Sequence, residues 1–459
     1  MKKLKPSQWE SLRKRLAPGE LKLDETTLAA HSGDKWFATG LPDAVALPRT
    51  AEAVSTILRF AKRHGIPVTP RAGGVGYVGG CVPVHGGIAL SVARMRRIRE
   101  IHEDDFVAVV QPGVITGQLQ EKVEARGLYY PPDPASRAEC CIGGNIATNA
   151  GGPRSLKYGV TSDYVLGLQA VLPDGAIVRV GGRTHKNKTG FDFPRFFTGT
   201  EGLLAVITEA TLKLLPLPPY RAALSIGLPS TRAAIRVIRA IFKTGLLPSA
   251  LEVADQFTLR AAQKRTGSKR FAGCKGHVIV ELDGQESSVR TELRHLKKLV
   301  AGFRPRFVDQ ALGDEAVEGI WQLRREFSYA LRDTGLKKLN EDIVVPRGQL
   351  EPLLAFTAQL QKKHDLPVAC FGHAGDGNIH TNVMVDESAP GHAKRKLAAL
   401  DELFAWVIAH GGVITGEHGV GMAKKRWWPQ AADKNVRRLH TIVKAAIDPD
   451  GLMNPGKFV

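Results

Sequence analysis

Residues 371–380 read Phe-Gly-His-Ala-Gly-Asp-Gly-Asn-Ile-His, and this segment constrains the fold strongly. Its glycines exclude an ordinary helix, and Gly375-Asp376 is typical of the centre of a tight hairpin turn. In that hairpin His373 lies opposite Asn378, and His380 is its diagonal neighbour on the same face, with Cβ atoms roughly 7–8 Å apart. Two imidazoles at that separation can converge on one metal ion, each at about 2.1 Å. The alternative is a glycine-rich turn with two purely structural histidines.

A second glycine-rich segment favours the metal site. Residues 411–421 read Gly-Gly-Val-Ile-Thr-Gly-Glu-His-Gly-Val-Gly. Adjacent side chains diverge on a strand or helix, so Glu417 and His418 can face one site only where the backbone is irregular, as these glycines permit. Glu417 would complete a two-histidine, one-carboxylate ligand set, and His418 would remain as a free base.

Length and composition indicate a soluble, multidomain protein. At 459 residues the chain is long for one core, so two or three domains are expected. No apolar run approaches a membrane span, and the basic N-terminus lacks an apolar signal core, so we expect a cytoplasmic protein. The five cysteines form no C-x-x-C pair, which argues against zinc ribbons and iron–sulfur clusters.

The net charge of +19 favours anionic partners such as nucleic acid, acidic lipid or small carboxylates. The basic residues lie in short clusters without interleaved aromatics or a nucleic-acid-binding signature. We therefore expect no nucleic-acid partner. A solvated basic surface is the simplest interpretation, and peripheral contact with the inner face of an anionic membrane is the alternative.

The order of predicted elements indicates an α+β protein in several parts. Prolines at 216, 218 and 219 predict a domain boundary. Before them, we predict a lead-in and helices at 51–64 and 117–125. The predicted strands of this part lie at 44–48, 66–70, 88–92, 106–110, 164–172, 177–180 and 206–215. After them, we predict strands at 222–226, 278–282 and 342–345, a further strand that leads into the histidine segment, and helices at 231–244, 287–303, 349–364, 394–410 and 431–446.

The loop after the strand at 66–70 contains Gly74-x-Gly76-x-x-Gly79, a formal match to the dinucleotide fingerprint. A helix should begin within that motif, but Gly79-Gly80-Cys81-Val82-Pro83 cannot be helical, and the ribose-binding acid is missing. We therefore reject a Rossmann fold. The glycine amides can still close on a pyrophosphate, to which Arg71 adds charge.

A run of small and polar residues at 142–152 follows the extended loop 129–134. Small side chains let a planar ligand lie against the backbone, and Asn145, Thr148 and Asn149 offer hydrogen bonds. The alternative is a buried helix start packed on a sheet.

Taken in order, these motifs make the chain resemble the FAD-linked D-2-hydroxyacid dehydrogenases, from about residue 40 to the end. The motifs that carry the resemblance are Pro70–Gly80, Pro131–Gly152, Leu156–Thr161, Gly199–Thr208, Gly372–His380, Gly416–Gly421 and Asn454–Lys457. The resemblance implies a vanillyl-alcohol-oxidase-like FAD-binding domain of two α+β subdomains, an α+β substrate-binding cap and a C-terminal segment that returns to the flavin. The corresponding ranges are a lead-in at 1–39 and domains at 40–218, 219–414 and 415–459.

The resemblance also implies the residues that hold FAD. The pyrophosphate loop, the segment along the flavin, the turn and strand near the adenosine, and a C-terminal asparagine near the ring supply them. They are Arg71, Gly73, Gly74, Val75, Gly76, Tyr77, Gly143, Gly144, Thr148, Asn149, Glu201, Gly202, Val206, Ile207 and Asn454. Relatives that attach flavin covalently carry His where this chain has Val75, so the FAD is expected to be non-covalent. Cys140-Cys141 and Phe191 depart from the usual family residues.

For the substrate site, the resemblance implies that His373, His380 and Glu417 bind a divalent metal and that His418 is the general base. Zn, Mn and Fe all tolerate this ligand set. Arg324, in Trp321-x-x-Arg324, would bind the substrate carboxylate, and supporting polar contacts would come from two further residues, Ser328 and Asn382. The neighbouring Arg325 leaves the register open. A following lysine, Lys337 or Lys338, is equally undecided.

The expected reaction is oxidation of a D-2-hydroxyacid to the 2-oxoacid, with His418 taking the hydroxyl proton and hydride passing to the flavin. Electrons would then leave to a separate acceptor, which is a quinone, an electron-transfer flavoprotein or a cytochrome. The oligomeric state, including a homodimer, stays open. The alternatives are an FAD enzyme of the same fold acting on another alcohol, a metal-dependent hydrolase without flavin, and a basic nucleic-acid-binding protein.

Overall fold

The computed structural model describes residues 4–459, and the chain divides into two compact units. Unit 1 comprises residues up to 150, 160–217 and 417–459, whereas unit 2 comprises 151–159 and 218–416. Among the described residues, none of the helices combines the length and the apolar character needed to cross a bilayer. The chain therefore enters unit 2 twice, and the first visit is the short segment at 151–159.

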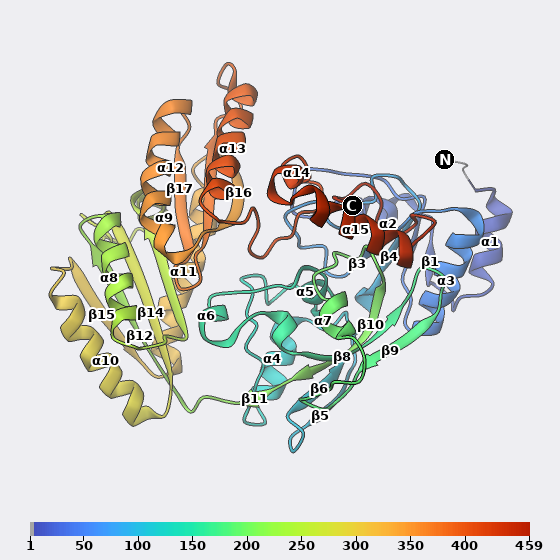
Figure 1. Ribbon diagram of the computed structural model, residues 1–459, viewed down its shortest axis with the longest axis horizontal. Coiled ribbons are helices and arrows are strands. Elements are labelled where there is room, and N and C mark those ends of the chain that lie inside the picture. The colour runs from blue at the N-terminus through green and yellow to red at the C-terminus, as the bar shows by residue number, and fades with distance from the viewer. Residues whose placement is uncertain (1–3) are drawn as a thin grey trace. The chain divides into compact units, whose positions relative to one another are not determined.

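Unit 1 contains a four-stranded and a five-stranded sheet (Figure 1). The first has the order β1-β2-β4-β3, with β2, β3 and β4 parallel, and the second is antiparallel in the order β5-β6-β10-β8-β9. A short antiparallel pair, β11-β7, forms a further two-stranded sheet. The strands are Leu21–Lys22 (β1), Ala44–Ala46 (β2), Val68–Arg71 (β3), Ile88–Ser91 (β4), Ile98–His102 (β5), Val107–Val110 (β6), Leu128–Tyr129 (β7), Val165–Val171 (β8), Ile177–Gly181 (β9), Val206–Lys213 (β10) and Leu215–Pro216 (β11).

The helices of unit 1 lie around these sheets. Their bounds are Pro6–Arg13 (α1), Glu25–Ala30 (α2), Ala51–His64 (α3), Thr116–Glu124 (α4), Ile142–Thr148 (α5), Phe193–Phe197 (α7), Trp428–Ala431 (α14) and Lys434–Ile447 (α15).

Helix α3 shows how local sequence sets an element in this unit. The Thr50 side chain accepts a hydrogen bond from Ala53 N at the start, and Gly65 ends the helix in the left-handed conformation, with φ of 63°. Val54, Ile57 and other residues at helical spacing pack into the core of the four-stranded sheet. The predicted helix at 51–64 is therefore confirmed, and the predicted hairpin at 164–180 forms as β8 and β9.

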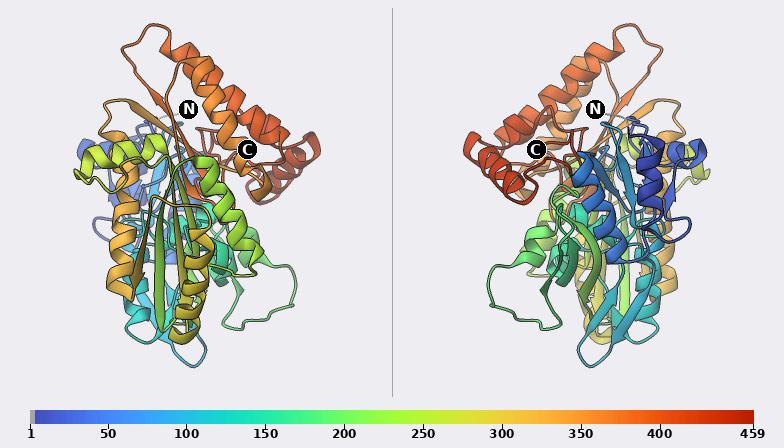
Figure 2. Two further views of the ribbon diagram at one scale, coloured as in Figure 1. Left: turned by 90° about the vertical axis from the view of Figure 1, so that its left-hand side faces the viewer. Right: turned by 90° about the vertical axis from the view of Figure 1, so that its right-hand side faces the viewer.

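Unit 2 is built on a seven-stranded antiparallel sheet with the order β15-β12-β14-β13-β17-β18-β16. Helices α8 and α10 contact one side of the sheet, and α9 and α11 lie on the other side (Figure 2). The strands are Tyr220–Leu228 (β12), Ala250–Asp255 (β13), Gly276–Gly284 (β14), Phe307–Leu312 (β15), Lys337–Val344 (β16), Val368–His373 (β17) and Asn378–Val385 (β18). The helices are Ser155–Tyr158 (α6), Thr231–Lys243 (α8), Gln256–Thr266 (α9), Glu286–Ala301 (α10), Asp314–Arg332 (α11), Leu350–His364 (α12) and His392–Ala409 (α13).

The loop after β3 has no helix between residues 72 and 87, which agrees with the rejection of a Rossmann fold. Gly74 has φ of +68°, and a Cβ there would lie 2.1 Å from Nη2 of Arg71. Arg71 thus folds back over its own loop, where Nη1 donates a hydrogen bond to Gly33 O at 2.5 Å. Any other residue at position 74 would have to displace that guanidinium and adopt a strained left-handed backbone, which favours glycine.

Candidate functional site

The histidine hairpin forms as predicted. His373 at the end of β17 pairs with Asn378 at the start of β18, and residues 374–377 make the turn. The rings of His373 and His380 lie with their centroids 5.5 Å apart on one face of the sheet. Both side chains are buried. The pairing of β17 with β18 therefore brings the two imidazoles close enough to bind one metal ion.

The third predicted ligand also lies close. Glu417, the residue that follows the last residue of unit 2, has no regular secondary structure around it. Gly416 N donates to Oδ2 of the buried Asp342 at 3.0 Å, which holds the chain just before Glu417. One ligand atom each from His373, His380 and Glu417 lies within 4.8 Å of the others. This donor set fits a divalent metal ion.

Glu252 on β13 is a residue of this site that sequence reasoning missed. Its Oε1 lies 2.5 Å from Nδ1 of His373, which it faces across the sheet. A carboxylate at Nδ1 fixes the ring orientation and leaves Nε2 as the nitrogen available to a metal. The site thus contains the carboxylate–histidine arrangement that usually supports metal ligands.

Glu252 also binds Arg324 on α11. Nε of Arg324 donates to Oε2 of Glu252 at 2.7 Å, and Nη2 lies 2.6 Å from the same oxygen. Burial alone would raise the pKa of the Glu252 carboxyl, but the adjacent His373 and Arg324 outweigh it and lower this pKa to about 2. Glu252 is therefore an anion that joins the candidate metal ligand to the candidate substrate-binding arginine.

The structure distinguishes the two adjacent arginines. Arg324 is 8% exposed and lies over the Phe371 ring, with its guanidinium 4.7 Å from the ring centroid. Arg325 points away from this cluster and pairs with Glu318 on the surface of α11. Nε and Nη2 of Arg324 are used by Glu252, which leaves Nη1 for a ligand. Arg324 is thus the arginine associated with the candidate site.

The two adjacent lysines differ in the same way. Lys337 pairs with Glu387 on the surface, whereas Nζ of Lys338 donates to Oγ of Ser328 at 2.7 Å. Burial, and then the positive charges of nearby arginines including Arg324, lower the pKa of Lys338 to about 7. Below about pH 7, Lys338 is therefore a second cation near Arg324, with Ser328 as its hydrogen-bond partner.

Asn382 on β18 is fully buried and acts as a brace for the strands. Its side-chain amide donates to the backbone oxygens of Ala369 at 3.1 Å and His380 at 2.9 Å. These bonds fix the strand that carries His380. A direct contact of Asn382 with substrate stays a prediction.

Unit 1 brings the predicted flavin-binding segments together. Asn454 is buried with φ of 47°, and its side-chain amide donates to the backbone oxygens of Gly80 and Glu201 at 2.8 Å each. One asparagine therefore joins the glycine-rich loop, the turn at 199–202 and the C-terminal segment. Gly202 packs against Pro70 at the end of β3, which places that turn beside the same loop.

The predicted flavin-lining segment forms helix α5. Gly144 faces Ala72 of the glycine-rich loop, with 3.7 Å from an added Cβ to the Ala72 Cβ. At the other end, Asn149 is left-handed with φ of 51°, and its Oδ1 accepts a hydrogen bond from Ser162 N. The backbone N–H of Glu201 donates to Ala147 O at 2.8 Å. The run is therefore a short helix whose Gly143 packs closely on Pro112, and its role along the flavin stays a prediction.

The side chain of Glu201 adds a contact that the sequence did not indicate. Its carboxylate accepts hydrogen bonds from Val420 N and Gly421 N, each at 2.8 Å. Burial raises the pKa of Glu201, and these two donors oppose that effect. The His418 ring, two residues earlier, stacks on Tyr77 with centroids 5.3 Å apart. The candidate base therefore lies against a residue of the glycine-rich loop.

Comparisons with known protein families identify two domains in the chain. Residues 42–181 match an FAD binding domain, and residues 217–458 match the C-terminal domain of FAD linked oxidases. The chain is thus an FAD-linked oxidoreductase. It is 36% identical to glycolate oxidase subunit GlcD of Bacillus subtilis over 91% of this chain and 89% of that one, and 32% identical to D-lactate dehydrogenase of Anaerostipes hadrus over 92% and 90%. The chain belongs to the FAD-linked D-2-hydroxyacid dehydrogenase family.

Solved structures support the fold. p-Cresol methylhydroxylase superposes with a TM-score of 0.81 at 17% identity, covering 98% of this chain and 96% of that chain. Alkyldihydroxyacetonephosphate synthase superposes with a TM-score of 0.77 at 19% identity, covering 99% and 85%. These likenesses confirm the predicted α+β fold with an FAD-binding domain and a C-terminal domain.

Proposed function

We propose that this enzyme oxidises a D-2-hydroxyacid to the 2-oxoacid. The observation that carries the proposal is Glu252, which binds His373 through one oxygen and Arg324 through the other. Because Arg324 and His373 both bind the buried Glu252 carboxylate, the distance between the substrate-binding arginine and the metal ligand is fixed. That arrangement suits a substrate with a carboxylate next to the reacting carbon.

The side chains divide the work as follows. Arg324 binds the substrate carboxylate through Nη1, and Lys338 with Ser328 adds a second cationic contact. His418 takes the hydroxyl proton as the α-carbon gives up hydride, and its ring is oriented by Tyr77. His373, His380 and Glu417 would hold a divalent ion, which supplies Lewis-acid polarisation of a substrate oxygen when bound. FAD, when bound, supplies the hydride acceptor.

Support for the substrate class comes from chemistry and from relatives. Two cations in one buried cluster are suited to a small carboxylate, and relatives at 32–36% identity are named glycolate oxidase and D-lactate dehydrogenase. We further propose that FAD is non-covalent and that electrons leave to a quinone or a protein carrier.

A dye-linked oxidation assay tests the proposal on D-lactate, glycolate, D-2-hydroxyglutarate and the L-isomers. Loss of one charge-assisted hydrogen bond costs about 1.5–3 kcal/mol, so Arg324→Gln should raise KM for the active acid by roughly 10–100-fold. Arg325→Gln is the matched control, because Arg325 pairs with Glu318 on the surface of α11. Equal KM values for the two variants would refute the role of Arg324.

A further inference from the structure

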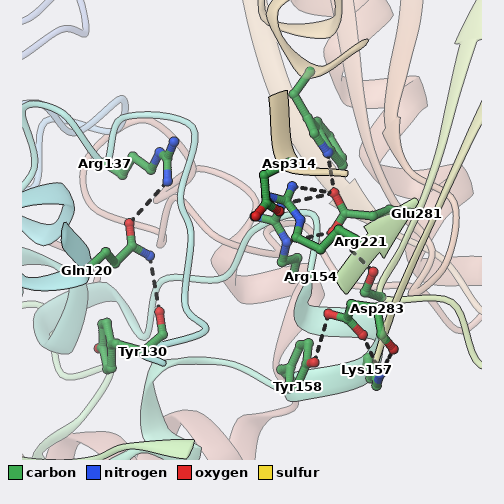
Figure 3. Close-up of polar contacts among 12 residues, drawn as sticks. Gln120, Tyr130, Arg137, Arg154, Lys157, Tyr158, Arg221, Glu281, Asp283 and Asp314 are labelled. Carbon is green, nitrogen blue, oxygen red and sulfur yellow. Dashed lines mark hydrogen bonds and ion pairs between the residues drawn. The ribbon is translucent and has the colours of Figure 1, made fainter. Parts of the chain in front are cut away.

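The segment at 151–159, which we call the strap, leaves unit 1 after Ala150, belongs to unit 2 and returns to unit 1 at Val160. Three of its side chains bind β14 (Figure 3). Lys157 pairs with Asp283 and also donates to Asp283 O at 3.1 Å, and the Tyr158 hydroxyl donates to Asp283 Oδ2 at 2.8 Å. Arg154 instead binds Glu281, two residues earlier on the strand, through Nε at 2.9 Å and Nη2 at 3.0 Å.

Glu281 gathers further donors at a fully buried position. It accepts hydrogen bonds from Nη2 of Arg221 at 2.8 Å, Oγ of Ser249 at 3.1 Å and Nε1 of Trp321 at 2.5 Å. Burial would raise the pKa of this carboxyl, but Arg154 and Arg221 lower it to about 2. Removing a charged partner such as Arg154 would leave the buried Glu281 carboxylate incompletely compensated, which is unfavourable. The donors around Glu281 therefore hold one another in place.

Trp321 connects this cluster to the candidate substrate site. Its indole is buried and makes two contacts with the residues described above. Nε1 donates to Glu281, and the Arg154 guanidinium lies 5.6 Å from the ring centroid. Arg324 lies three residues later on α11, on the same buried side of the helix. Holding Trp321 therefore limits the rotation and sliding of the helical turn that presents Arg324.

A continuous set of contacts thus runs from the strap to the candidate metal ligand. Arg154 binds Glu281, and Glu281 binds Trp321 on α11. One turn further on, Arg324 binds Glu252, which binds His373. Glu281 on β14 and Glu252 on β13 lie on the same side of the sheet, because Ala250, two residues before Glu252, pairs with Glu281.

We propose that Arg154 is a positioning residue for substrate binding, which acts through Glu281 and Trp321 on the turn of α11 that carries Arg324. The inference rests on the proposed role of Arg324 in binding the substrate carboxylate. Arg154 reaches that turn of α11 through Glu281 and the Trp321 ring. Its effect should therefore appear in substrate affinity and in the dynamics of α11, with the chemical step changed much less.

The test compares Arg154→Gln with Lys157→Gln. Both changes remove one cation of the strap, but Lys157 binds Asp283, whereas Arg154 binds Glu281, the carboxylate that accepts the hydrogen bond from Trp321 of α11. Arg154→Gln should raise KM for the active hydroxyacid about tenfold or more, with kcat changed less than threefold and FAD content unchanged. Lys157→Gln should change KM less than twofold. Arg154→Lys, which keeps the charge without the bidentate geometry, should give an intermediate KM.

Amide hydrogen exchange gives a readout that does not depend on activity. Exchange over residues 318–326 should accelerate several-fold in Arg154→Gln and remain at the wild-type rate in Lys157→Gln. Where Arg154→Gln fails to fold, Trp321→Phe removes the Nε1 donor to Glu281, along with part of the ring, and should raise KM in the same direction. Unchanged KM and unchanged exchange in the Arg154 variants, or equal changes in the Lys157 variant, would overturn the proposal.

The proposed substrate-binding role of Arg324 and the proposed positioning role of Arg154 can fail separately. If Arg324→Gln leaves KM unchanged while Arg154→Gln accelerates exchange in α11, the substrate-binding role of Arg324 is wrong and the positioning contact stands. If Arg324→Gln raises KM but Arg154→Gln alters neither KM nor exchange, the proposed function stands and the positioning role of Arg154 is wrong.

Discussion

Replacing Glu252 by Gln tests the link between metal binding and substrate binding. Gln has almost the same shape, but it carries no charge and offers one oxygen and one NH₂ group. If its oxygen faces Arg324, its NH₂ faces Nδ1 of His373, where a donor is already expected. The ring must then change its tautomer, which protonates the nitrogen that a metal needs.

The expected magnitude follows from comparable changes. Loss of a partner behind a metal-binding histidine typically weakens metal affinity by about 10–100-fold, or about 1.4–2.7 kcal/mol. Arg324 is nearly buried and would lose its anion, and breaking a buried ion pair costs about 3–5 kcal/mol of folding stability. Glu252→Gln should therefore lower both metal affinity and the midpoint of thermal unfolding.

The assay titrates Mn²⁺ or Zn²⁺ into metal-depleted protein by calorimetry, and unfolding is followed in parallel. Asp255→Asn is the matched control, since Asp255 lies at the end of the same strand as Glu252. The Asp255 carboxylate caps α9 and accepts a hydrogen bond from Cys370 N. The control should lose stability without losing metal affinity. Metal affinity that is equal in wild type and Glu252→Gln would refute the assigned role of Glu252.

Three further predictions concern the lysine, the flavin and its attachment. Because the pKa of Lys338 is lowered to about 7, its ammonium form prevails below that pH, so KM should rise as pH increases through about 7, and Lys338→Met should flatten that dependence in steady-state assays. Asn454→Ala removes the donor to the part-buried Gly80 O and to the buried Glu201 O, and the loss at the buried oxygen costs about 1–3 kcal/mol, so the purified protein should show a lower ratio of flavin to protein absorbance and a lower unfolding midpoint. With Val75 in the loop, acid precipitation should release all the FAD into the supernatant, whereas flavin retained in the pellet would contradict non-covalent binding.

Features set by short-range chemistry were predictable from the sequence. The hairpin register of His373 and Asn378 follows from the period of a strand and the glycines of the turn, and it is confirmed. Thr50 and Gly65 likewise mark the ends of α3. The irregular backbone at Glu417 is confirmed as well, because glycine spacing limits the backbone locally.

Contacts between distant segments were not predictable in this way. No helix was assigned to α11, although its apolar residues recur at helical spacing, and a charged Arg324 within that stripe is a signal that a buried partner exists. Glu252 as that partner is 72 residues away in the chain and is selected only when β13 and α11 pack together. The side-chain role of Glu201 depends on a similar contact with Val420 and Gly421.

Anaerobic flavin bleaching tests the central claim most directly. The purified protein would be mixed, without oxygen, with D-lactate, glycolate, D-2-hydroxyglutarate and the L-isomers, before and after chelator treatment. We expect one of the 2-hydroxyacids to abolish the flavin absorbance band, and a chiral acid to do so only as the D-isomer. Chelator treatment should prevent this bleaching, and adding a divalent metal should restore it. Bound flavin that none of these acids reduces, before or after metal addition, would contradict the proposed hydroxyacid oxidation.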